Sequence, residues 1–280
     1  MPPHARKSGS LPPTGGRALP WDGPAEAPIL RAESLAVSVG LHKVCLSLDL
    51  ALPAGGRLAI LGRNGAGKST LLSTLAGLRA QDAGTLHLDG RTYAEHGPRE
   101  AAQRRGWLGQ DGGDPFASTV LETVLIGRHP HLPRWAWEAD EDIGIARAAL
   151  ADVGLAGFEE REIHTLSGGE YQRVRIAMLL AQRPRLYLLD EPLAHLDLNH
   201  QLAVLALFSR LAREEGAAVV MVLHDPNLAL RFCDQALLLY GDSRHRIGSS
   251  EEVLREDVLS ELYGCRLRWV ERPHPHFVPE

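Results

Sequence analysis

The chain has 280 residues, of which 44% are hydrophobic and 23% are charged, and its formal net charge at pH 7 is −5. This length and composition suit one soluble globular domain, or one domain with an inserted lobe. The mildly acidic balance disfavours a general nucleic-acid binder, and no apolar run approaches the ~18 residues needed to cross a bilayer.

The two ends of the chain differ in composition from the part between them. Residues 1–28 are rich in proline, glycine and small polar residues, and we expect a disordered extension there. It has Arg6 and Lys7 near its start but no apolar segment after them, which is not the pattern of a secretion signal. Residues 271–280 are expected to form a flexible tail. The chain's three cysteines show neither a metal-ligand spacing nor a disulfide framework, so we expect a reducing compartment.

The first half of the chain reads as strands with one early helix. Apolar residues alternate partly over Leu35–Val39 and Val44–Leu50, as they do in half-buried strands. Arg57–Leu61 is a short, mostly apolar run that predicts a buried strand, and a helical pattern follows over Ser69–Leu78. Thr85–Leu88 ends in an Asp-Gly turn and predicts a further strand.

The second half of the chain alternates helices with buried strands. Between residues 111 and about 165, helices interrupted by glycine and proline predict an inserted helical lobe. The continuous apolar runs Leu186–Leu189 and Ala218–Leu223 predict strands. Helical patterns flank these runs at Glu170–Gln182 and Leu198–Glu214. Such alternation indicates a parallel sheet that helices cover on both faces.

The first chemical motif is a glycine-rich turn between a predicted strand and a predicted helix. The phosphate loop, as we call it, reads Gly62-Arg63-Asn64-Gly65-Ala66-Gly67-Lys68-Ser69 and matches G-x-x-x-x-G-K-[ST]. Backbone N–H groups of such a loop wrap a polyphosphate, and the helix directs its positive dipole end at it. Lys68 would supply charge to the terminal phosphates, and Ser69 a hydroxyl ligand for magnesium. The loop alone leaves kinases, GTPases and ATPase motors open.

The second motif is a pair of adjacent carboxylates, Asp190 and Glu191, after the predicted strand Leu186–Leu189. In open α/β sheets, ligands bind beyond the carboxyl ends of the strands. Phosphate-loop enzymes need one acid there for the magnesium shell and a second group to orient the attacking water. We therefore assign Asp190 to magnesium and Glu191 to the water. The alternative for the pair by itself is a solvated Asp-Glu turn.

The third motif, which we call the signature segment, is Leu166-Ser167-Gly168-Gly169-Glu170. Ser167 and Glu170 form an S-x-x-E capping box, which predicts that a helix begins here. Two glycines at a helix start let an anion approach the backbone closely. The capping box alone would indicate an ordinary capped helix, whereas the whole string is far more specific.

These motifs, followed by Leu189-Asp190-Glu191-Pro192, occur in the order found in the ATP-binding subunits of ABC transporters. The chain resembles that family from about residue 30 to residue 265. The resemblance implies an ABC ATPase domain over residues 29–270. Its α/β fold would combine a phosphate-loop core with a mostly parallel sheet, an N-terminal antiparallel β subdomain and an inserted helical subdomain.

The resemblance also implies the roles of further residues. Gln110 resembles the glutamine that contacts magnesium and senses the membrane partner, Asp197 belongs to a segment like the D-loop, and His224 resembles the switch histidine at the γ-phosphate. Two copies would face each other head to tail. Each ATP, with Mg²⁺, would be held between the phosphate loop and Thr70 of one copy and Ser167–Glu170 of the other, and the expected assembly is a homodimer.

Two segments narrow the class of transporter. Residues Phe116–Val120 and Gly127–His131 resemble the ATPases of importers for iron-siderophores, haem and cobalamin. The expected function is therefore ATP hydrolysis that powers metal-chelate import through a multi-span permease. The subunit would be peripheral, at the cytoplasmic face of the cell membrane, with a substrate-binding protein acting indirectly and no nucleic-acid partner.

One departure from the family's pattern concerns the adenine contact. The family often carries an aromatic residue, commonly tyrosine, before the first hairpin, whereas Ala36–His42 lacks one. We expect Val39 or a neighbour to make only an apolar contact with the base. This departure, together with the segment at Phe116, slightly favours cobalamin over an iron-siderophore as the transported chelate.

Two other function classes compete with the transport motor. A soluble ABC ATPase acting on DNA or ribosomes usually has long coiled-coil insertions or two tandem units, but this chain has one phosphate loop and no sustained heptads. An ATP-driven binding subunit without catalysis is the other alternative. The presence of all four candidate residues for ATP binding and hydrolysis, Lys68, Asp190, Glu191 and His224, argues against this alternative. A GTPase is disfavoured because no base-reading N-K-x-D segment occurs.

Overall fold

The computed structural model describes residues 27–110, 117–133, 137–271 and 276–279. Its strands are β1 (Leu30–Val39), β2 (His42–Leu52), β3 (Arg57–Gly62), β4 (Ala83–Leu88), β5 (Arg91–Thr92), β6 (Arg105–Leu108), β7 (Leu186–Asp190), β8 (Ala218–Val222), β9 (Gln235–Leu239), β10 (His245–Ser249), β11 (Leu267–Val270) and β12 (His276–Pro279). Its helices are α1 (Lys68–Leu75), α2 (Tyr93–Arg104), α3 (Val120–Leu125), α4 (Asp140–Asp152), α5 (Gly168–Gln182), α6 (Leu198–Glu215), α7 (Pro226–Phe232), α8 (Ser250–Val253) and α9 (Glu256–Tyr263), with short 3₁₀ turns η1 (Ile126–Arg128) and η2 (Ile163–Thr165).

A six-stranded sheet forms the centre of the described chain, in the order β10-β9-β3-β8-β7-β6. β3 pairs in parallel with both β8 and β9, and β6, β7 and β8 also run parallel, so only the edge strand β10 is antiparallel. Every residue of β7 and β8 is buried. Strands covered on both faces need continuous apolar sequence, which is why these runs were readable as buried strands.

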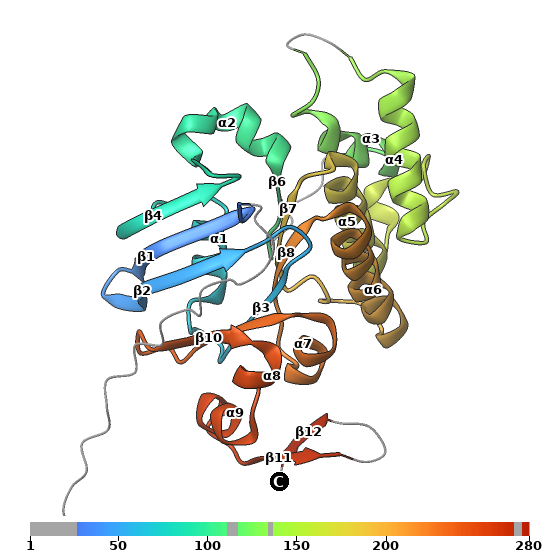
Figure 1. The fold of residues 1–280 in the computed structure, drawn as a ribbon. Helices are drawn as coiled ribbons and strands as arrows, with labels where there is room; N and C mark the ends of the chain where they lie inside the picture. Colours follow the sequence, from blue (N-terminus) through green and yellow to red (C-terminus); the bar gives the residue numbers. More distant parts are fainter. Residues whose placement is uncertain (1–26, 111–116, 134–136, 272–275, 280) are drawn as a thin grey trace, which may run out of the picture.

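Two apolar cores lie on opposite faces of this sheet because successive side chains of a strand point in opposite directions. Leu58 and Ile60 of β3 join a core with α1 and the antiparallel sheet β2-β1-β4-β5. Ala59 and Leu61 join the other core, which includes α5 and α6. Figure 1 shows the antiparallel sheet on the left and the helices α3–α6 on the right of the central strands.

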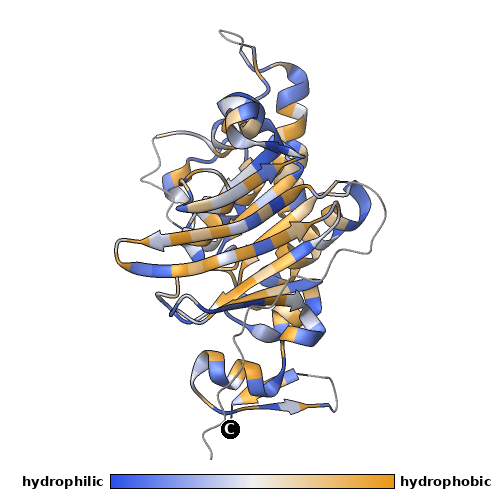
Figure 2. Cartoon of the chain, turned by 60° about the vertical axis from the view of Figure 1, so that its left-hand side comes forward, coloured by the Kyte–Doolittle hydropathy of each residue, from blue (hydrophilic) through white to orange (hydrophobic). Residues whose placement is uncertain are grey.

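The antiparallel sheet confirms the expected N-terminal β subdomain. β1 pairs with β2 on one side and with β4 on the other, and both long strands extend beyond the ranges predicted from alternation. In Figure 2, hydrophobic and hydrophilic residues alternate along its front strands. This is the pattern of a sheet with one buried and one solvated face.

The helical lobe is built around α5. Helices α3 and α4 pack on α5 and on each other, so the lobe extends past its predicted end near residue 165. Arg128 of η1 is buried, and its Nε lies 2.8 Å from Asp142 Oδ1 on α4. Its Nη1 also donates to the Ala181 carbonyl at 2.9 Å. The buried arginine therefore ties η1, α4 and α5 together.

Several boundaries differ from the predictions. Helix α1 ends at Leu75 rather than Leu78, because Gly77 takes a left-handed conformation (φ +66°) that stops the helix. The tail expected to be flexible contains β12, which pairs with β11. Residues 1–26 of the expected extension, and Phe116 of the segment that resembles chelate importers, lie outside the described residues. Within the described chain, no helix has the length and apolar character required to span a bilayer.

Candidate active site

The carboxyl ends of neighbouring parallel strands bring the candidate residues together at one edge of the central sheet. β3 runs directly into the phosphate loop, and β7 ends at Asp190. Asp190 is paired with Val222 of β8, so His224, two residues beyond, leaves the sheet beside it. β6 pairs in parallel with β7, and Gln110 follows two residues after β6. The topology thus assembles four segments that are far apart in sequence.

The phosphate loop is shaped by a close approach of β2. Gly67 precedes α1 in a left-handed conformation (φ +92°). A Cβ at Gly67 would lie 2.5 Å from the Val44 side chain, which is buried in the β2 wall of the core. A side chain at this position would push the loop away from β2, so glycine is required both for conformation and for space.

Lys68 lies folded back across the phosphate loop. The residue is 6% exposed, and Nζ donates to the carbonyl oxygens of Gly62 at 2.9 Å and Arg63 at 3.1 Å. Burial lowers the pKa of Lys68, and the charges of Glu191 and Asp190 oppose that shift. The ammonium group is therefore held at the loop by weak carbonyl partners, which a phosphate can replace with stronger, charge-assisted hydrogen bonds.

Asp190 is a buried carboxylate with unused ligand capacity. It is 3% exposed, and its Oδ1 has no hydrogen-bond partner among the described residues. Burial raises the pKa of Asp190, and Glu191 adds to the shift, while a hydrogen bond from Ser69 and the charge of Lys68 counteract it. An unpaired carboxylate oxygen beside a hydroxyl offers the hard oxygen donors that magnesium prefers. The residues present fit a magnesium ion.

Glu191 and His224 contact each other at the end of β7 and β8. Glu191 Oε1 lies 2.9 Å from His224 Nε2, and their side chains are 23% and 51% exposed. Glu191 adopts φ +50°, a conformation that non-glycine residues rarely take and that is costly to hold. Glu191 also borders the cleft at the phosphate loop.

The phosphate loop opens into a cleft of about 500 Å³. Besides Gln110 and Glu191, the cleft is bordered by Val39 and by His42 at the start of β2. Val39 is the residue that we expected, from the sequence, to make an apolar contact with the base. His42 was missed, although its imidazole is a flat ring that can stack on a base. The residues that line the cleft from the loop and α1 are Asn64, Gly65, Gly67, Lys68, Ser69 and Thr70.

The signature segment lies in a different hollow of about 480 Å³. Ser167 and Glu170 make the predicted capping box, because Glu170 N donates to Ser167 Oγ at 3.3 Å and Ser167 N donates to Glu170 Oε2 at 2.8 Å. Arg161 Nη1 lies 3.3 Å from Glu170 Oε1. The hydrogen bonds with Ser167, followed by the charge of Arg161, lower the pKa of Glu170. Glu170 therefore serves the helix cap.

The same hollow contains the loop before α6. A Cβ at Gly169 would lie 2.9 Å from the His195 carbonyl oxygen, so glycine lets the signature segment sit directly on that loop. Asp197 caps α6 by accepting from His200 N at 2.9 Å. Gly168 and Asp197 line the hollow, and none of its lining residues borders the phosphate-loop cleft. One described chain thus carries the two predicted halves of the ATP site on separate surfaces.

The fold and the edge of the central sheet define a phosphate-loop nucleotide hydrolase of the α/β class. The family described as ABC transporter matches residues 45–194. The chain belongs to the ABC transporter family, and it hydrolyses ATP as members of that family do. Both the predicted family and the predicted fold are confirmed.

Two relatives and two solved structures illustrate the similarity. The chain is 37% identical over 245 residues to the ferric enterobactin transport ATP-binding protein FepC of Escherichia coli, covering 87% of this chain and 90% of that protein. It is 46% identical over 220 residues to the hemin import ATP-binding protein HmuV of Deinococcus radiodurans. The match covers 77% of this chain and 82% of that protein.

Among solved structures, an inward-facing conformation of a putative metal-chelate type ABC transporter has a chain that is 31% identical, with a TM-score of 0.79 and coverage of 91% of this chain and 98% of that one. The ATP-binding cassette MJ0796, in a dimeric post-hydrolysis state bound to ADP and Pi, is 26% identical to this chain, with a TM-score of 0.68. The match covers 79% of this chain and 98% of that one.

Proposed function

We propose that this chain is the ATP-hydrolysing subunit of a metal-chelate importer, peripheral at the cytoplasmic face of a membrane and bound to a multi-span permease. The observation that carries the proposal is the similarity along most of the chain to subunits named for ferric enterobactin transport and hemin import. The solved metal-chelate type transporter supports the same class. The chelate itself would be recognised by the permease and by a binding protein, because the nucleotide cleft has no role in that choice.

In the proposed reaction, the phosphate loop and Lys68 bind the triphosphate of ATP. Ser69, Asp190 and Gln110 would hold Mg²⁺, which when bound neutralises charge on the phosphate oxygens. Glu191 orients a water whose oxygen attacks the γ-phosphorus while the bond to the bridging oxygen of ADP breaks, and the water's proton passes to the Glu191 carboxylate. His224 holds Glu191 through the contact at 2.9 Å. Val39 and His42 contact the base.

We also propose that two copies share each ATP. A γ-phosphate bound at the phosphate loop faces solvent, because the signature segment of the same chain lies in another hollow. The N-terminus of α5, which is 15 residues long and begins with two glycines, offers free N–H groups and a positive dipole end to an anion. A head-to-tail homodimer brings that helix end from one protomer to the ATP of the other.

A glycine substitution tests this shared site. In a Glu191→Gln background, which retains ATP, we expect ATP to convert the chain into a dimer in a sizing experiment. Adding Gly168→Asp, where a Cβ would meet only an ordinary contact with His195 at 3.6 Å, should weaken this dimer at least about tenfold, because a carboxylate would face the partner's γ-phosphate at a cost of roughly 1.4 kcal/mol or more. ATP binding to the monomer should remain unchanged.

The matched control for the dimer test is Gly144→Asp on α4, where a Cβ would meet nothing within 4 Å. This variant should dimerise like its parent. If Gly168→Asp dimerises as well as its parent, the signature segment does not cover the partner's nucleotide and the shared site is wrong.

Uptake by a reconstituted complex tests the transport function. The chain should co-purify with a multi-span permease rather than with nucleic acid. Vesicles containing that complex and a substrate-binding protein should accumulate one of three labelled chelates, cobalamin, an iron-siderophore or haem, only when ATP is supplied on the side of this subunit. Glu191→Gln should abolish the accumulation. Failure of all three chelates to accumulate, with ATP hydrolysis intact, would contradict the proposed cargo class but not the ATPase assignment.

A further inference from the structure

A second pocket lies in the C-terminal part of the chain, away from the nucleotide cleft. It has a volume of about 620 Å³ and is enclosed by α7, the segment through α8 and the start of α9, and the hairpin β11–β12. No residue that borders it belongs to the phosphate loop, the signature segment or the acid pair. This pocket therefore has no role in the proposed transport cycle.

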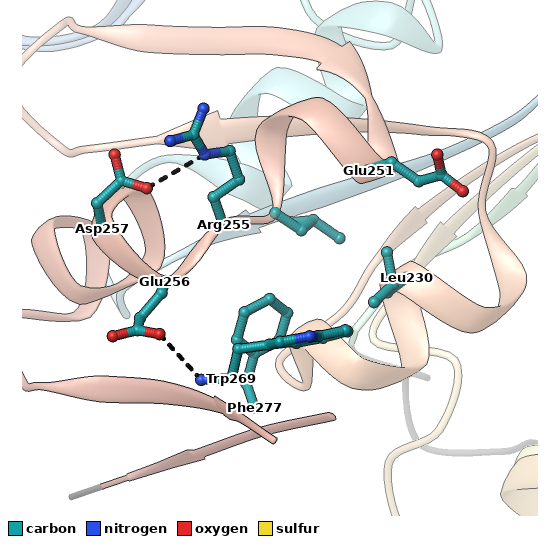
Figure 3. A pocket seen from close by; sticks show the side chains of 8 residues that line it. Leu230, Glu251, Arg255, Glu256, Asp257, Trp269 and Phe277 are labelled. Atoms are coloured by element: carbon teal, nitrogen blue, oxygen red, sulfur yellow. Dashed lines mark hydrogen bonds and ion pairs between the residues drawn. The ribbon is translucent and has the colours of Figure 1, made fainter. Parts of the chain in front are cut away.

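The floor of this pocket is apolar and aromatic. Leu254 and Phe277 are 3% and 6% exposed. The ring centroids of Trp269 and Phe277 are 4.7 Å apart, so the hairpin presents two tilted aromatic rings side by side. Figure 3 shows these rings together, with the Leu230 side chain of α7 facing them across the pocket. Such a floor favours a ligand with an apolar body.

The rim of the pocket is acidic. Glu251, Glu256 and Asp257 contribute three negative charges, and Arg255 contributes one positive charge, which leaves a net charge of −2. Arg255 Nε lies 3.3 Å from Asp257 Oδ1, so the one cation among the described residues of the lining already has a partner. Glu256 Oε2 accepts a hydrogen bond from the backbone N–H of Trp269 at 3.2 Å, which fixes this carboxylate on the residue that carries the indole. A cation over an indole face and beside a carboxylate is favoured by both groups.

The pocket wall is connected to His224, which contacts Glu191. Asn227 of α7 accepts from Phe277 N at 2.6 Å and donates to Phe277 O at 3.3 Å, which clamps α7 to the aromatic hairpin. Helix α7 begins at Pro226, only two residues after His224. The Tyr263 hydroxyl at the end of α9 donates to the His224 carbonyl oxygen at 3.3 Å. A ligand that shifts the hairpin or α7 therefore acts on the segment that holds His224 against Glu191.

We propose that this pocket binds an amphipathic organic cation, an apolar body with one ammonium group, and that its occupancy changes the rate of ATP hydrolysis through α7. The volume of the pocket is in the range of small-molecule sites, which favours a free small molecule over a partner chain. The binding half of this inference is independent of the proposed transport function, whereas the rate effect rests on the ATPase activity alone.

Matched probes test the binding. The full chain without ATP should bind 3-phenylpropylammonium at least about tenfold more tightly than the neutral 3-phenylpropanol, a difference of about 1.4 kcal/mol, and should not bind 3-phenylpropanoate. Calorimetry or ligand-observed NMR measures the three affinities. The double variant Glu251→Gln, Glu256→Gln should bring the cation to within about twofold of the alcohol, since only the charge is removed.

Hydrolysis with the probe present tests the coupling. Saturation with 3-phenylpropylammonium should change kcat at least about twofold in the wild type. Tyr263→Phe removes the hydroxyl that contacts His224 O, so it should reduce that response while probe affinity stays the same. The double glutamine variant keeps its basal rate and does not respond at probe concentrations that saturate the wild type.

Three outcomes would overturn the inference. The first is no binding of the cation at millimolar concentration, and the second is equal affinity for the cation and the alcohol. The third is a bound cation that leaves kcat unchanged. Because Glu141→Gln alters an exposed acid on α4, it serves as the matched control and should affect neither the binding nor the response.

Discussion

Replacing Glu191 by glutamine is expected to lower the rate of ATP hydrolysis by about 100- to 10,000-fold, the range for loss of a general base. The amide keeps the size of the side chain and its contact with His224, but it cannot take a proton from the attacking water. Binding of ATP uses the phosphate loop and should persist. Steady-state phosphate release together with equilibrium ATP binding measures the two effects separately.

The control for this change is Glu141→Gln, which removes an exposed acid in the helical lobe and should leave both measurements unchanged. His224→Ala should also slow hydrolysis, because it removes the group that holds Glu191 at 2.9 Å. Normal turnover in Glu191→Gln would show that another residue positions the water, although it would leave the phosphate loop intact as the ATP site.

Replacing Lys68 by alanine is expected to weaken ATP binding by about ten- to a few hundred-fold. A hydrogen bond to a charged group contributes about 1.5–3 kcal/mol, and Lys68 is the one lysine among the described residues that line the cleft. Hydrolysis at saturating ATP should fall as well, since Lys68 also meets charge that develops on the phosphates. Titration with a fluorescent ATP analogue measures the affinity.

Lys43 offers a matched control, because the sequence has only three lysines and Lys43 is exposed on β2. Lys43→Ala should bind ATP like the wild type. Lys68→Ala removes the ammonium group that donates hydrogen bonds to the carbonyl oxygens of Gly62 and Arg63. The thermal unfolding midpoint of the variant should therefore be measured to verify that it folds. Wild-type ATP affinity in a folded Lys68→Ala chain would contradict the role given to this lysine.

Three of the six strands of the central sheet, β3, β7 and β8, were readable from the sequence because they are short, mostly apolar runs, whereas β6, β9 and β10 were not predicted. Leu186–Leu189 and Ala218–Leu223 carry no polar interruption, and the structure places β7 and β8 there. The strand β6 was missed, since Arg105–Leu108 has only four residues and follows directly on α2. The hairpin β11–β12 was also missed, because its pairing depends on contacts with α7 that local sequence does not encode.

The sequence supplied the candidate residues, and the family resemblance supplied their division between two copies; the role of each residue stays a prediction. The motifs name the phosphate loop, Asp190, Glu191 and His224, and the parallel sheet gathers them at one edge. The coordinates add that the signature segment and the phosphate loop of one chain line two different hollows. His42 was not recognised as a base contact, since a histidine at the start of a strand carries no pattern of its own.

The position of α5 has a mechanical consequence. The helix carries the signature segment at its first turn, while α3 and α4 pack against it and Arg128 bonds to the carbonyl of Ala181 near its end. A helix of 15 residues is about 22 Å long, so a tilt of about 10° around its far end displaces its first turn by about 4 Å. That displacement exceeds the length of a hydrogen bond. In the shared site proposed above, such a displacement of α5 would be enough to engage or release the γ-phosphate bound by the other copy, so a neighbouring protein that tilts α5 would control that contact.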